Sequence, residues 1–260
     1  MSELRELLKA DDYSISNWTC DGQDSPQRDE VKSSCEIVFV RSGVFVATSR
    51  GDETLLTPNE VWLHPPGLPY RIRHPRGGDA CTVLTISEEL RDQYAPRIQK
   101  RAVAAVTSRI FLVQHRLWSL ARRSETSLLE ADESVRLILE EIYAHEPLPS
   151  MSRRHRLLVR RSQELLAARF TDNLSLRDLA ATVGASQYHL SRIFRRGTGH
   201  SLHGYQRTLR VRAALSRLAQ GESDLTRLAL DLGFCDHSHF TRSFARTFGQ
   251  PPSRWRESKP

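Results

Sequence analysis

An internal repeat in the C-terminal part of the sequence constrains the fold of this chain more than any other feature. The stretch LRDLAATVGASQYHLSRIFRRGTG (176–199) aligns with LTRLALDLGFCDHSHFTRSFARTFG (225–249). Five positions recur 49 residues later: Leu176, Leu179, Ala180, Val183 and Gly184 as Leu225, Leu228, Ala229, Leu232 and Gly233. Four more recur 50 residues later: Leu190, Arg192, Phe194 and Gly199 as Phe240, Arg242, Phe244 and Gly249. One structural unit is therefore used twice, with one extra residue in the second copy.

Each copy has the pattern of two short helices joined by a sharp turn. In the first copy, Ser175 and Asp178 have the spacing of a capping box at a helix start. Gly184 supplies the turn, because glycine adopts a positive φ without a Cβ penalty. Ser186 is placed to cap the second helix. In the second copy the turn and the cap fall at Gly233 and Asp236. Both copies are predicted to be helix-turn-helix units.

The second helix of each copy has an apolar face and a polar face. The apolar faces hold Leu190, Ile193 and Phe194 in the first copy and Phe240 and Phe244 in the second. The polar faces hold Tyr188, Ser191, Arg192 and Arg195 in the first copy, and Ser238, Thr241, Arg242 and Ala245 in the second, with His237 at the helix start. One such face is often only a solvated surface. Two in tandem favour the major groove of DNA, which admits an α-helix and whose guanine edges bind arginine bidentately.

The uneven charge of the chain favours the same partner. Residues 151–260 carry 20 Lys and Arg against 8 Asp and Glu, a net charge of +12. Residues 1–150 carry 18 against 23, a net charge of −5. A strongly basic segment is typical of proteins that bind a polyanion. A long helix over 201–220 would join the two units and place both second helices on one side of a duplex.

The repeat and its flanks resemble the DNA-binding domain of the AraC/XylS family of transcription regulators over about residues 155–257. The residues that carry the resemblance are Gly233, Phe234, Asp236, Ser238, Phe240, Arg242, Phe244, Gly249, Pro251, Pro252, Ser253 and Arg256. The resemblance implies base reading in double-stranded promoter DNA by Gln187, Tyr188, Ser191, Arg192, His237, Ser238, Thr241 and Arg242. Backbone contacts are expected from Arg195, Arg196, Arg207 and Arg246. Ala245 departs from the family, in which a basic residue is common there.

Residues 1–87 are predicted to form an all-β domain. Runs of β-branched or aromatic residues at 35–40, 44–49, 60–65, 70–74 and 81–86 are separated by turns rich in Gly, Pro, Asn and Asp. In the run at 70–74, Tyr70, Ile72 and His74 share one face and Arg71 and Arg73 share the other. Helical periodicity follows over 95–123 and 127–146.

The order of these segments predicts an α+β protein of two domains. A cupin-like β-barrel (about 1–87) and the following helices (about 88–146) would form a sensor and dimerisation domain, 1–146. A linker at 147–154 would lead to an all-α DNA-binding domain with two helix-turn-helix units at 155–260. The first half is similar to the sensor half of AraC-type regulators, which implies a small-molecule effector in the barrel. Candidate lining residues are Trp62, His64, Tyr70 and His74.

A cupin enzyme fused to a DNA-binding tail is the rival from another class of protein. Cupin enzymes bind metal through an HxH motif, a downstream Glu and a later His that follows a P-x-G turn. The turn is present at Pro65–Pro69, but Tyr70 stands in place of the histidine, and residues 1–150 contain no HxH motif. Since a catalytic zinc usually needs three converging protein ligands, we expect neither enzymatic activity nor a cofactor.

A thiol- or metal-responsive regulator is a second alternative. It requires four scattered residues, Cys20, Cys35, His74 and Cys81, to converge in the folded chain. The competing interpretation of the segment between His74 and Cys81 is a plain hairpin, in which Gly77 and Gly78 reverse the chain. The cysteines have neither the spacing of a disulfide framework nor that of a structural zinc motif.

A further group, Cys235, His237 and His239, is close in sequence and also invites a metal interpretation. These residues coincide with the turn and helix start of the second helix-turn-helix unit, where DNA recognition needs exposed polar groups. We therefore predict no metal there. An architectural DNA protein without an effector is disfavoured by the size of the N-terminal half.

The expected partners follow from the family resemblance. A homodimer would form through helices within 88–146, and promoter-bound protein would contact RNA polymerase. The N-terminal stretch MSELRELLKADDYS is charged and lacks the apolar core of a signal peptide, and the sequence has no apolar run long enough for a membrane helix. A cytoplasmic protein with no membrane partner is expected.

Overall fold

The computed structural model describes residues 2–22, 29–75, 77–94, 103–123, 127–144 and 151–257. The chain divides into two compact units, Met1–Pro147 and Leu148–Pro260. The first is rich in strands and the second is helical, which confirms the predicted α+β class with two domains. Residues 147–150 of the expected linker (147–154), and the last two residues of the helix expected at 127–146, lie outside the described residues. The next helix begins at Arg153, two residues inside the expected linker.

The N-terminal unit is built on two sheets. Its strands are β1 (Ser2–Lys9), β2 (Tyr13–Cys20), β3 (Cys35–Ser42), β4 (Phe45–Ser49), β5 (Asp52–Leu56), β6 (Glu60–His64), β7 (Arg71–Arg73), β8 (Asp79–Ile86) and β9 (Val103–Ala105). A six-stranded sheet has the order β1-β2-β8-β3-β6-β9, and a three-stranded sheet has the order β5-β4-β7. The expected barrel is thus formed of two facing sheets, and a closed ring of strands is not recorded among the described residues.

Alternation along the strands produces the core between the two sheets. Val38 pairs with Val83 and Val40 with Cys81, so these side chains share one face of the six-stranded sheet. They pack in one apolar cluster with Phe45, Ala47 and Leu56 of the three-stranded sheet and with Trp62 and Tyr70. The predicted alternation at 70–74 is confirmed, because Tyr70 is buried while Arg71 and Arg73 are exposed.

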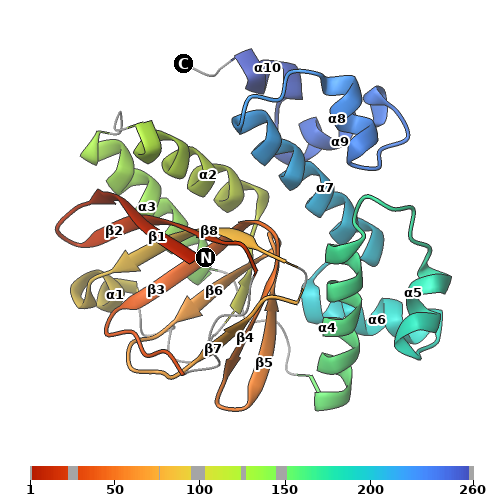
Figure 1. Ribbon diagram of the computed structural model, residues 1–260, viewed down its shortest axis with the longest axis horizontal. Coiled ribbons are helices and arrows are strands. Elements are labelled where there is room, and N and C mark those ends of the chain that lie inside the picture. The colour runs from red at the N-terminus through yellow and green to blue at the C-terminus, as the bar shows by residue number, and fades with distance from the viewer. Residues whose placement is uncertain are drawn as a thin grey trace. The chain divides into compact units, whose positions relative to one another are not determined.

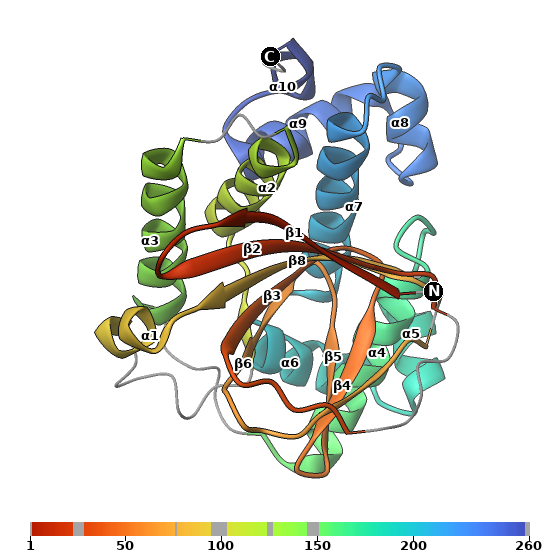
Figure 2. The same ribbon diagram turned by 60° about the vertical axis from the view of Figure 1, so that its left-hand side comes forward.

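Helices cover the other side of the six-stranded sheet (Figure 2). They are α1 (Glu88–Tyr94), α2 (Ser108–Arg123) and α3 (Leu128–Ala144). Trp118 of α2 donates its indole N–H to Asn17 Oδ1 at 3.1 Å, and the Arg41 guanidinium lies 4.2 Å from the Trp118 ring centroid. Arg41 lies at a bulge between Val40 and Ser42. Its side chain points to the face of the six-stranded sheet that the helices cover, where it contacts Trp118.

The prediction of a helix over 95–123 was wrong for residues 103–107, and residues 95–102 lie outside the described residues. Val103–Ala105 is β9, paired with β6, and α2 starts only at Ser108. Thr107 Oγ1 accepts the Ile110 N–H at 3.1 Å, so a cap separates the strand from the helix. Strands β1, β2 and β5 were also missed. The sequence of β1 is charged, and among the described strands it pairs with β2 alone.

The C-terminal unit consists of α4 (Arg153–Ala168), α5 (Leu176–Val183), α6 (Gln187–Thr198), α7 (Leu202–Ala219), α8 (Leu225–Asp231), α9 (His237–Phe248) and α10 (Pro252–Glu257). Helix α7 runs from the group α4–α6 to the group α8–α10 (Figure 1). The first group packs around Leu190, Phe194 and Tyr205, all of which are 0% exposed. Among the described residues, no helix is both long and apolar enough to cross a membrane.

Candidate nucleic-acid interface and N-terminal cavity

The first helix-turn-helix unit is α5 and α6, and each of its predicted caps is present. Ser175 Oγ accepts the Asp178 N–H at 3.1 Å and donates to Asp178 Oδ2 at 2.6 Å. Gly184 ends α5 in the left-handed region, with φ 71°. Ser186 Oγ accepts the His189 N–H at 3.3 Å and so starts α6. These contacts satisfy backbone N–H groups that have no partner within the helix itself. The caps and the glycine turn therefore fix where α5 ends and α6 begins.

Helix α6 presents a polar face to solvent. Leu190 and Phe194 are fully buried, whereas Tyr188 is 79% exposed, an unusual exposure for a large ring. The structure therefore brings the four predicted base readers of this unit onto one exposed helix: Gln187, Tyr188, Ser191 and Arg192. A free aromatic ring beside an arginine fits a groove in which bases offer both methyl groups and hydrogen-bond acceptors.

The second unit, α8 and α9, repeats the construction. Asp224 Oδ1 accepts the N–H groups of Thr226 and Arg227 at 3.1 and 2.9 Å, and Asp236 Oδ1 accepts the His239 N–H at 2.6 Å. Phe240 and Phe244 are fully buried. Three of the four predicted base readers on α9, His237, Ser238 and Arg242, are exposed.

Thr241 differs from the other predicted base readers. Its side chain is half-buried, and Thr241 Oγ1 is buried with no hydrogen-bond partner among the described residues. The periodicity of α9 places it at the edge between the two faces. A polar atom in that position lacks the hydrogen bond that burial usually requires.

Arginine side chains flank the two second helices. Arg195 and Arg196 lie in the last turn of α6, Arg246 lies in the last turn of α9, and Arg207 lies on α7. All four predicted backbone contacts are exposed. Cations in these places are available to phosphates on either side of a groove.

Arg210 on α7 links the two helix-turn-helix units of the C-terminal unit, and the sequence analysis did not identify this role. Its Nε donates to Phe170 O at 2.5 Å, Nη2 donates to Asp172 O at 2.7 Å and Nη1 donates to Gly233 O at 2.6 Å. One guanidinium thus joins the chain before α5 to the turn between α8 and α9. Burial lowers the pKa of Arg210, while Asp172 is among the groups that raise it.

The N-terminal unit contains a cavity of about 270 Å³ between its sheets. Three of the four predicted lining residues, Trp62, Tyr70 and His74, line it. His64 does not: its ring packs 4.8 Å from Trp62 and 4.5 Å from Tyr70, and its Nε2 bonds Leu68 O at 3.0 Å. Burial lowers the pKa of His64.

Further lining residues bring charge into this cavity. They include Trp18 of the missed strand β2, Glu30 and Lys32, which lie outside the predicted strands, and Glu36, which lies in the strand predicted at 35–40 but was not assigned to the cavity. The Tyr70 hydroxyl donates to Glu30 Oε2 at 2.9 Å, and burial is the main reason that the pKa values of Tyr70 and Glu36 are raised. An aromatic wall with a few charged groups is typical of a small-molecule site.

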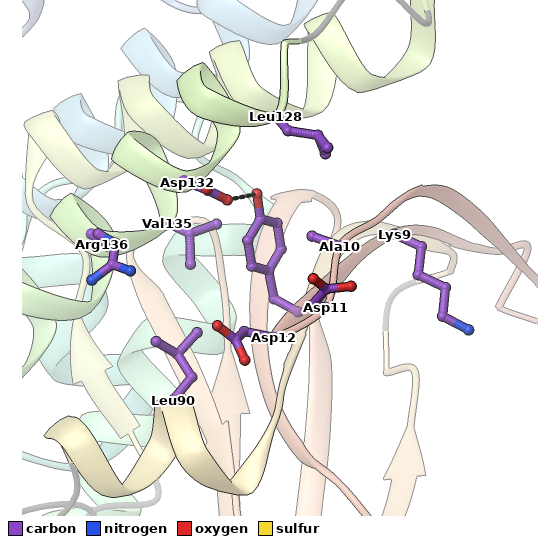
Figure 3. Close-up of a pocket in the computed structure, with 10 residues that line it drawn as sticks. Lys9, Ala10, Asp11, Asp12, Leu90, Leu128, Asp132, Val135 and Arg136 are labelled. Atoms are coloured by element: carbon purple, nitrogen blue, oxygen red, sulfur yellow. Dashed lines mark hydrogen bonds between the residues drawn. The ribbon is translucent and has the colours of Figure 1, made fainter.

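A second cavity of about 410 Å³ lies where the β1–β2 turn meets α1 and α3 (Figure 3). The Tyr13 hydroxyl donates to Asp132 Oδ1 at 2.7 Å across it, and Leu128 at the rim is 57% exposed. Burial raises the pKa of Tyr13, and Asp132 adds to that rise. The hydrogen bond ties β2 to α3.

The four thiol and imidazole groups of the alternative site do not all converge. Cys35 pairs with Ile86 and lies on the helical side of the six-stranded sheet, opposite the face that carries Cys81. Cys20, His74 and Cys81 do come together, and they surround Asp79, which the sequence analysis did not include. The hairpin interpretation of the segment around Gly77 and Gly78 was wrong, because β7 and β8 belong to different sheets.

The second suspected metal group has no support in the described residues. Among the described residues, the group of His, Cys, Asp and Glu side chains that lie within metal-binding distance of one another is Cys20, His74 and Asp79, in the N-terminal unit. His239 instead packs against Phe234, with ring centroids 5.4 Å apart.

Comparison with known proteins agrees with the geometry of the C-terminal unit. A family model described as a helix-turn-helix domain matches residues 179–258. The right origin-binding protein of Escherichia coli (strain K12) is 35% identical over 85 residues, which is 33% of this chain and 29% of that protein. The multiple antibiotic resistance protein MarA of Salmonella typhimurium is 34% identical over 83 residues, 32% of this chain and 65% of that protein. The C-terminal unit is an AraC-type helix-turn-helix domain.

The AraC-type domain is the part of the chain that these relatives share, and the match spans under a third of the right origin-binding protein. Among solved structures, ToxT from Vibrio cholerae O395 is 14% identical, with a TM-score of 0.38 over 95% of this chain and 98% of that one. The C-terminal domain of AraT from Geobacillus stearothermophilus is 23% identical, with a TM-score of 0.38 over 39% of this chain and 85% of that one.

Proposed function

We propose that this protein is a sequence-specific transcription regulator that inserts α6 and α9 into successive segments of the DNA major groove. The observation that carries the proposal is the pair of capped helix-turn-helix units whose second helices both present an exposed arginine, Arg192 and Arg242. The net charge of +12 over residues 151–260 supplies long-range attraction to the duplex.

Base reading and backbone contact are assigned to different side chains. Arg192 and Arg242 bind guanine O6 and N7, each worth about 1–3 kcal/mol at its base pair. Gln187, Tyr188, Ser191, His237 and Ser238 read neighbouring positions, and Thr241 contributes from the edge of α9. Arg195, Arg196, Arg207 and Arg246 bind phosphates, which adds affinity without discriminating sequence.

The spacing of the two recognition helices is held by α7 and by Arg210. The Arg210 guanidinium bonds carbonyl oxygens of the segment before α5 and of the turn after α8, which favours movement of the two helix-turn-helix units as one body. Such a body reads two half-patterns about one helical turn of DNA apart, roughly 34 Å.

The N-terminal unit is proposed as the sensor. A small molecule with an apolar body and a polar end fits the cavity of about 270 Å³, which offers Trp62 and Tyr70 as apolar walls and Lys32 as a cation. Homodimerisation through α2 and α3, and contact with RNA polymerase, complete the proposed mechanism. We assign no reaction to the chain: Tyr70, which occupies the place of a cupin metal ligand, bonds Glu30 instead.

The proposal is tested by binding the purified protein to fragmented host DNA at two salt concentrations and sequencing what is retained. We expect a recurrent motif of two half-patterns one helical turn apart at both concentrations. Binding that shows no motif and disappears at the higher salt concentration would reduce the C-terminal unit to an electrostatic anchor. A protein carrying both Arg192→Ala and Arg242→Ala is the matched control and should recover no motif.

A further inference from the structure

The ends of β2 and β8 bring together sulfur, nitrogen and oxygen donors. Cys20 is the last residue of β2 and pairs in register with Asp79, the first residue of β8. Cys81 follows Asp79 by two residues and therefore lies on the same face of the sheet. His74 comes from the segment after β7, so residues from three parts of the chain contribute.

The donor atoms of these side chains are close and buried. Cys20 Sγ lies 3.8 Å from His74 Nδ1, His74 Nε2 lies 2.6 Å from Asp79 Oδ1, and Cys81 Sγ lies 2.9 Å from Asp79 Oδ2. One donor atom from each of Cys20, His74 and Asp79 lies within 4.8 Å of the other two. The side chains of His74 and Asp79 are only 3% and 1% exposed.

His74 and Asp79 form a close, buried pair. His74 Nε2 lies 2.6 Å from Asp79 Oδ1, and neither atom has a further hydrogen-bond partner among the described residues. Buried polar atoms usually make the bonds open to them, so a metal ion bound by this nitrogen and this oxygen would supply a missing partner.

A disulfide does not explain the two thiols. In the ladder, Cys81 is directly opposite Trp18, and Cys20 is opposite Asp79, so the two cysteines are diagonal neighbours. Diagonal positions in an antiparallel pair lie about 7–8 Å apart, beyond the usual Cα–Cα range of a disulfide. Two cysteines whose Cα atoms lie at that separation can still bind one ion, because their side chains extend toward it from the same face of the sheet.

We propose that Cys20, His74 and Asp79 bind a thiophilic divalent metal ion such as Zn²⁺, with Cys81 placed as the fourth donor. Zinc takes sulfur, imidazole nitrogen and carboxylate oxygen in a tetrahedron, in which donor atoms lie about 3.3–3.8 Å apart. His74 binds one ion through one nitrogen, and one donor atom from each of Cys20, His74 and Asp79 lies within 4.8 Å of the other two. The 2.6 Å contact of His74 Nε2 with Asp79 Oδ1 needs to open by under about 1 Å to reach the tetrahedral range.

The site adjoins the sensor cavity. His74, Asp79 and Cys81 belong to the wall of the cavity of about 270 Å³, so an ion reaches them from that space. Metal binding stands without the proposed function, whereas a role for the ion in shaping the effector pocket rests on it.

The test is metal binding by the full chain after treatment with a chelator, with Co²⁺ as a spectroscopic probe and Zn²⁺ as its competitor. We expect one equivalent of Co²⁺ to produce thiolate-to-cobalt absorption, and Zn²⁺ to abolish it. Cys20→Ser, His74→Gln and Asp79→Asn should each weaken Co²⁺ binding by more than ~100-fold, the upper cost of losing an outer-shell partner. Cys35→Ser and Cys235→Ser are the matched controls and should bind as the wild type does.

A second measurement keeps the test informative where a variant fails to fold. Zn²⁺ should protect Cys20 and Cys81 of the wild-type chain from alkylation, as mapped by mass spectrometry, and leave Cys235 unprotected. Absence of cobalt–thiolate absorption in the wild type, or equal absorption in Cys20→Ser, overturns the metal site. Because both readouts are made without DNA, that failure is distinct from a failure to find a DNA motif.

Discussion

Arg192 and Arg242 occupy equivalent places on α6 and α9, and both are proposed to read bases in the DNA site. Each is exposed beside a buried phenylalanine, Phe194 or Phe244, that fixes the helix in the domain. A guanidinium presented from a fixed helix loses little freedom on binding, so its hydrogen bonds to a guanine edge are available as specificity.

Arg192→Ala is expected to weaken binding to the protein's own operator by about 5- to 150-fold, the equivalent of 1–3 kcal/mol. Binding to a scrambled duplex should change far less, because that binding depends on phosphates. Fluorescence anisotropy with both duplexes measures the two losses. Arg195→Ala is the matched control: it should weaken both alike and lower the slope of log K against log salt by about 1. Equal losses from Arg192→Ala on both duplexes would reject its role as a base reader.

The sequence correctly predicted which side chains are buried where the helical period assigns each residue clearly to the apolar or the polar face. Leu190 and Phe194 lie in the core and Tyr188 and Arg192 lie outside, because a helix with one apolar stripe buries that stripe. It was less successful for Thr241 and His64, at the edge of a face or in a strand buried on both sides. There the neighbouring element, and not the period, decides burial.

At the scale of elements, the turn of the second unit is more constrained than that of the first. Gly184 and Gly233 both have positive φ, 71° and 78°. A Cβ on Gly184 would meet nothing within 4 Å, whereas a Cβ on Gly233 would lie 1.9 Å from Thr171 O. The sequence repeat made the two glycines look equivalent, and only the folded chain shows that one of them touches another segment.

Gly184→Ala should cost about 1–2 kcal/mol, the penalty of a left-handed conformation for a residue with a Cβ. Gly233→Ala should cost more, because the chain at Thr171 must also move and the Arg210 bonds are disturbed. Hydrogen exchange of peptides from α5–α6 and α8–α9 in the full chain measures both local stabilities. Equal exchange in the two variants would contradict the close approach at Gly233.

The docking of α2 on the sheet should make the N-terminal unit sensitive to mild acid. His115 of α2 is 1% exposed, and burial, then the Arg41 guanidinium, lower its pKa to about 4. The unfolded chain binds this proton near its ordinary pKa of about 6.5, before the folded chain does. Stability should therefore be lost as the pH falls from about 6.5 to 4, by roughly 2–3 kcal/mol, and it should be unaffected by His115 above that range.

Urea unfolding at several pH values, followed by near-ultraviolet circular dichroism, measures this loss. His115→Gln should reduce the change in the free energy of unfolding between pH 6.5 and 4, whatever its effect on the stability at neutral pH. His237→Gln, which changes an exposed histidine on α9, should leave the dependence as it is. An unchanged pH dependence in His115→Gln would show that other groups govern acid unfolding of the N-terminal unit; His64, whose pKa burial also lowers, is the next to test.

The elements missed from the sequence share one physical cause, which is that their structure depends on distant partners. Strand β1 is a charged segment that forms only by pairing with β2, and β9 continues without a break in composition toward α2. The helices of the C-terminal unit were predictable because Ser175, Ser186 and Asp236 cap them locally. Local signals are readable from sequence, whereas strand pairing at a sheet edge is not.

At the scale of the whole molecule, the division between a β-rich unit of net negative charge and a helical unit of net positive charge follows from composition. The sequence also predicted an aromatic cavity, and Trp62, Tyr70 and His74 do line one. It could not predict how Arg210 fastens the loop before α5 to the turn after α8, because all of its acceptors are backbone carbonyl oxygens with no sequence signature.

The Arg210 contacts should restrict the spacing between the two half-patterns of the DNA site. If the two helix-turn-helix units move as one body, α6 and α9 reach two half-patterns only at one separation and one rotation about the duplex axis. Inserting about 5 base pairs between the half-patterns should reduce affinity to that of a single half-pattern, because the second pattern turns to the far side of the DNA.

Inserting about 10 base pairs, a full helical turn, should not restore the affinity, since the second pattern faces the right way but lies about 34 Å too far along. Two bodies joined by a flexible linker would instead recover most of their affinity at that spacing. Anisotropy titrations with the three duplexes distinguish these cases, and Arg210→Ala provides the control, since a loosened domain should tolerate altered spacing better than the wild type. Recovery at the full-turn insertion in the wild type would show that the Arg210 contacts do not hold α6 and α9 in one frame.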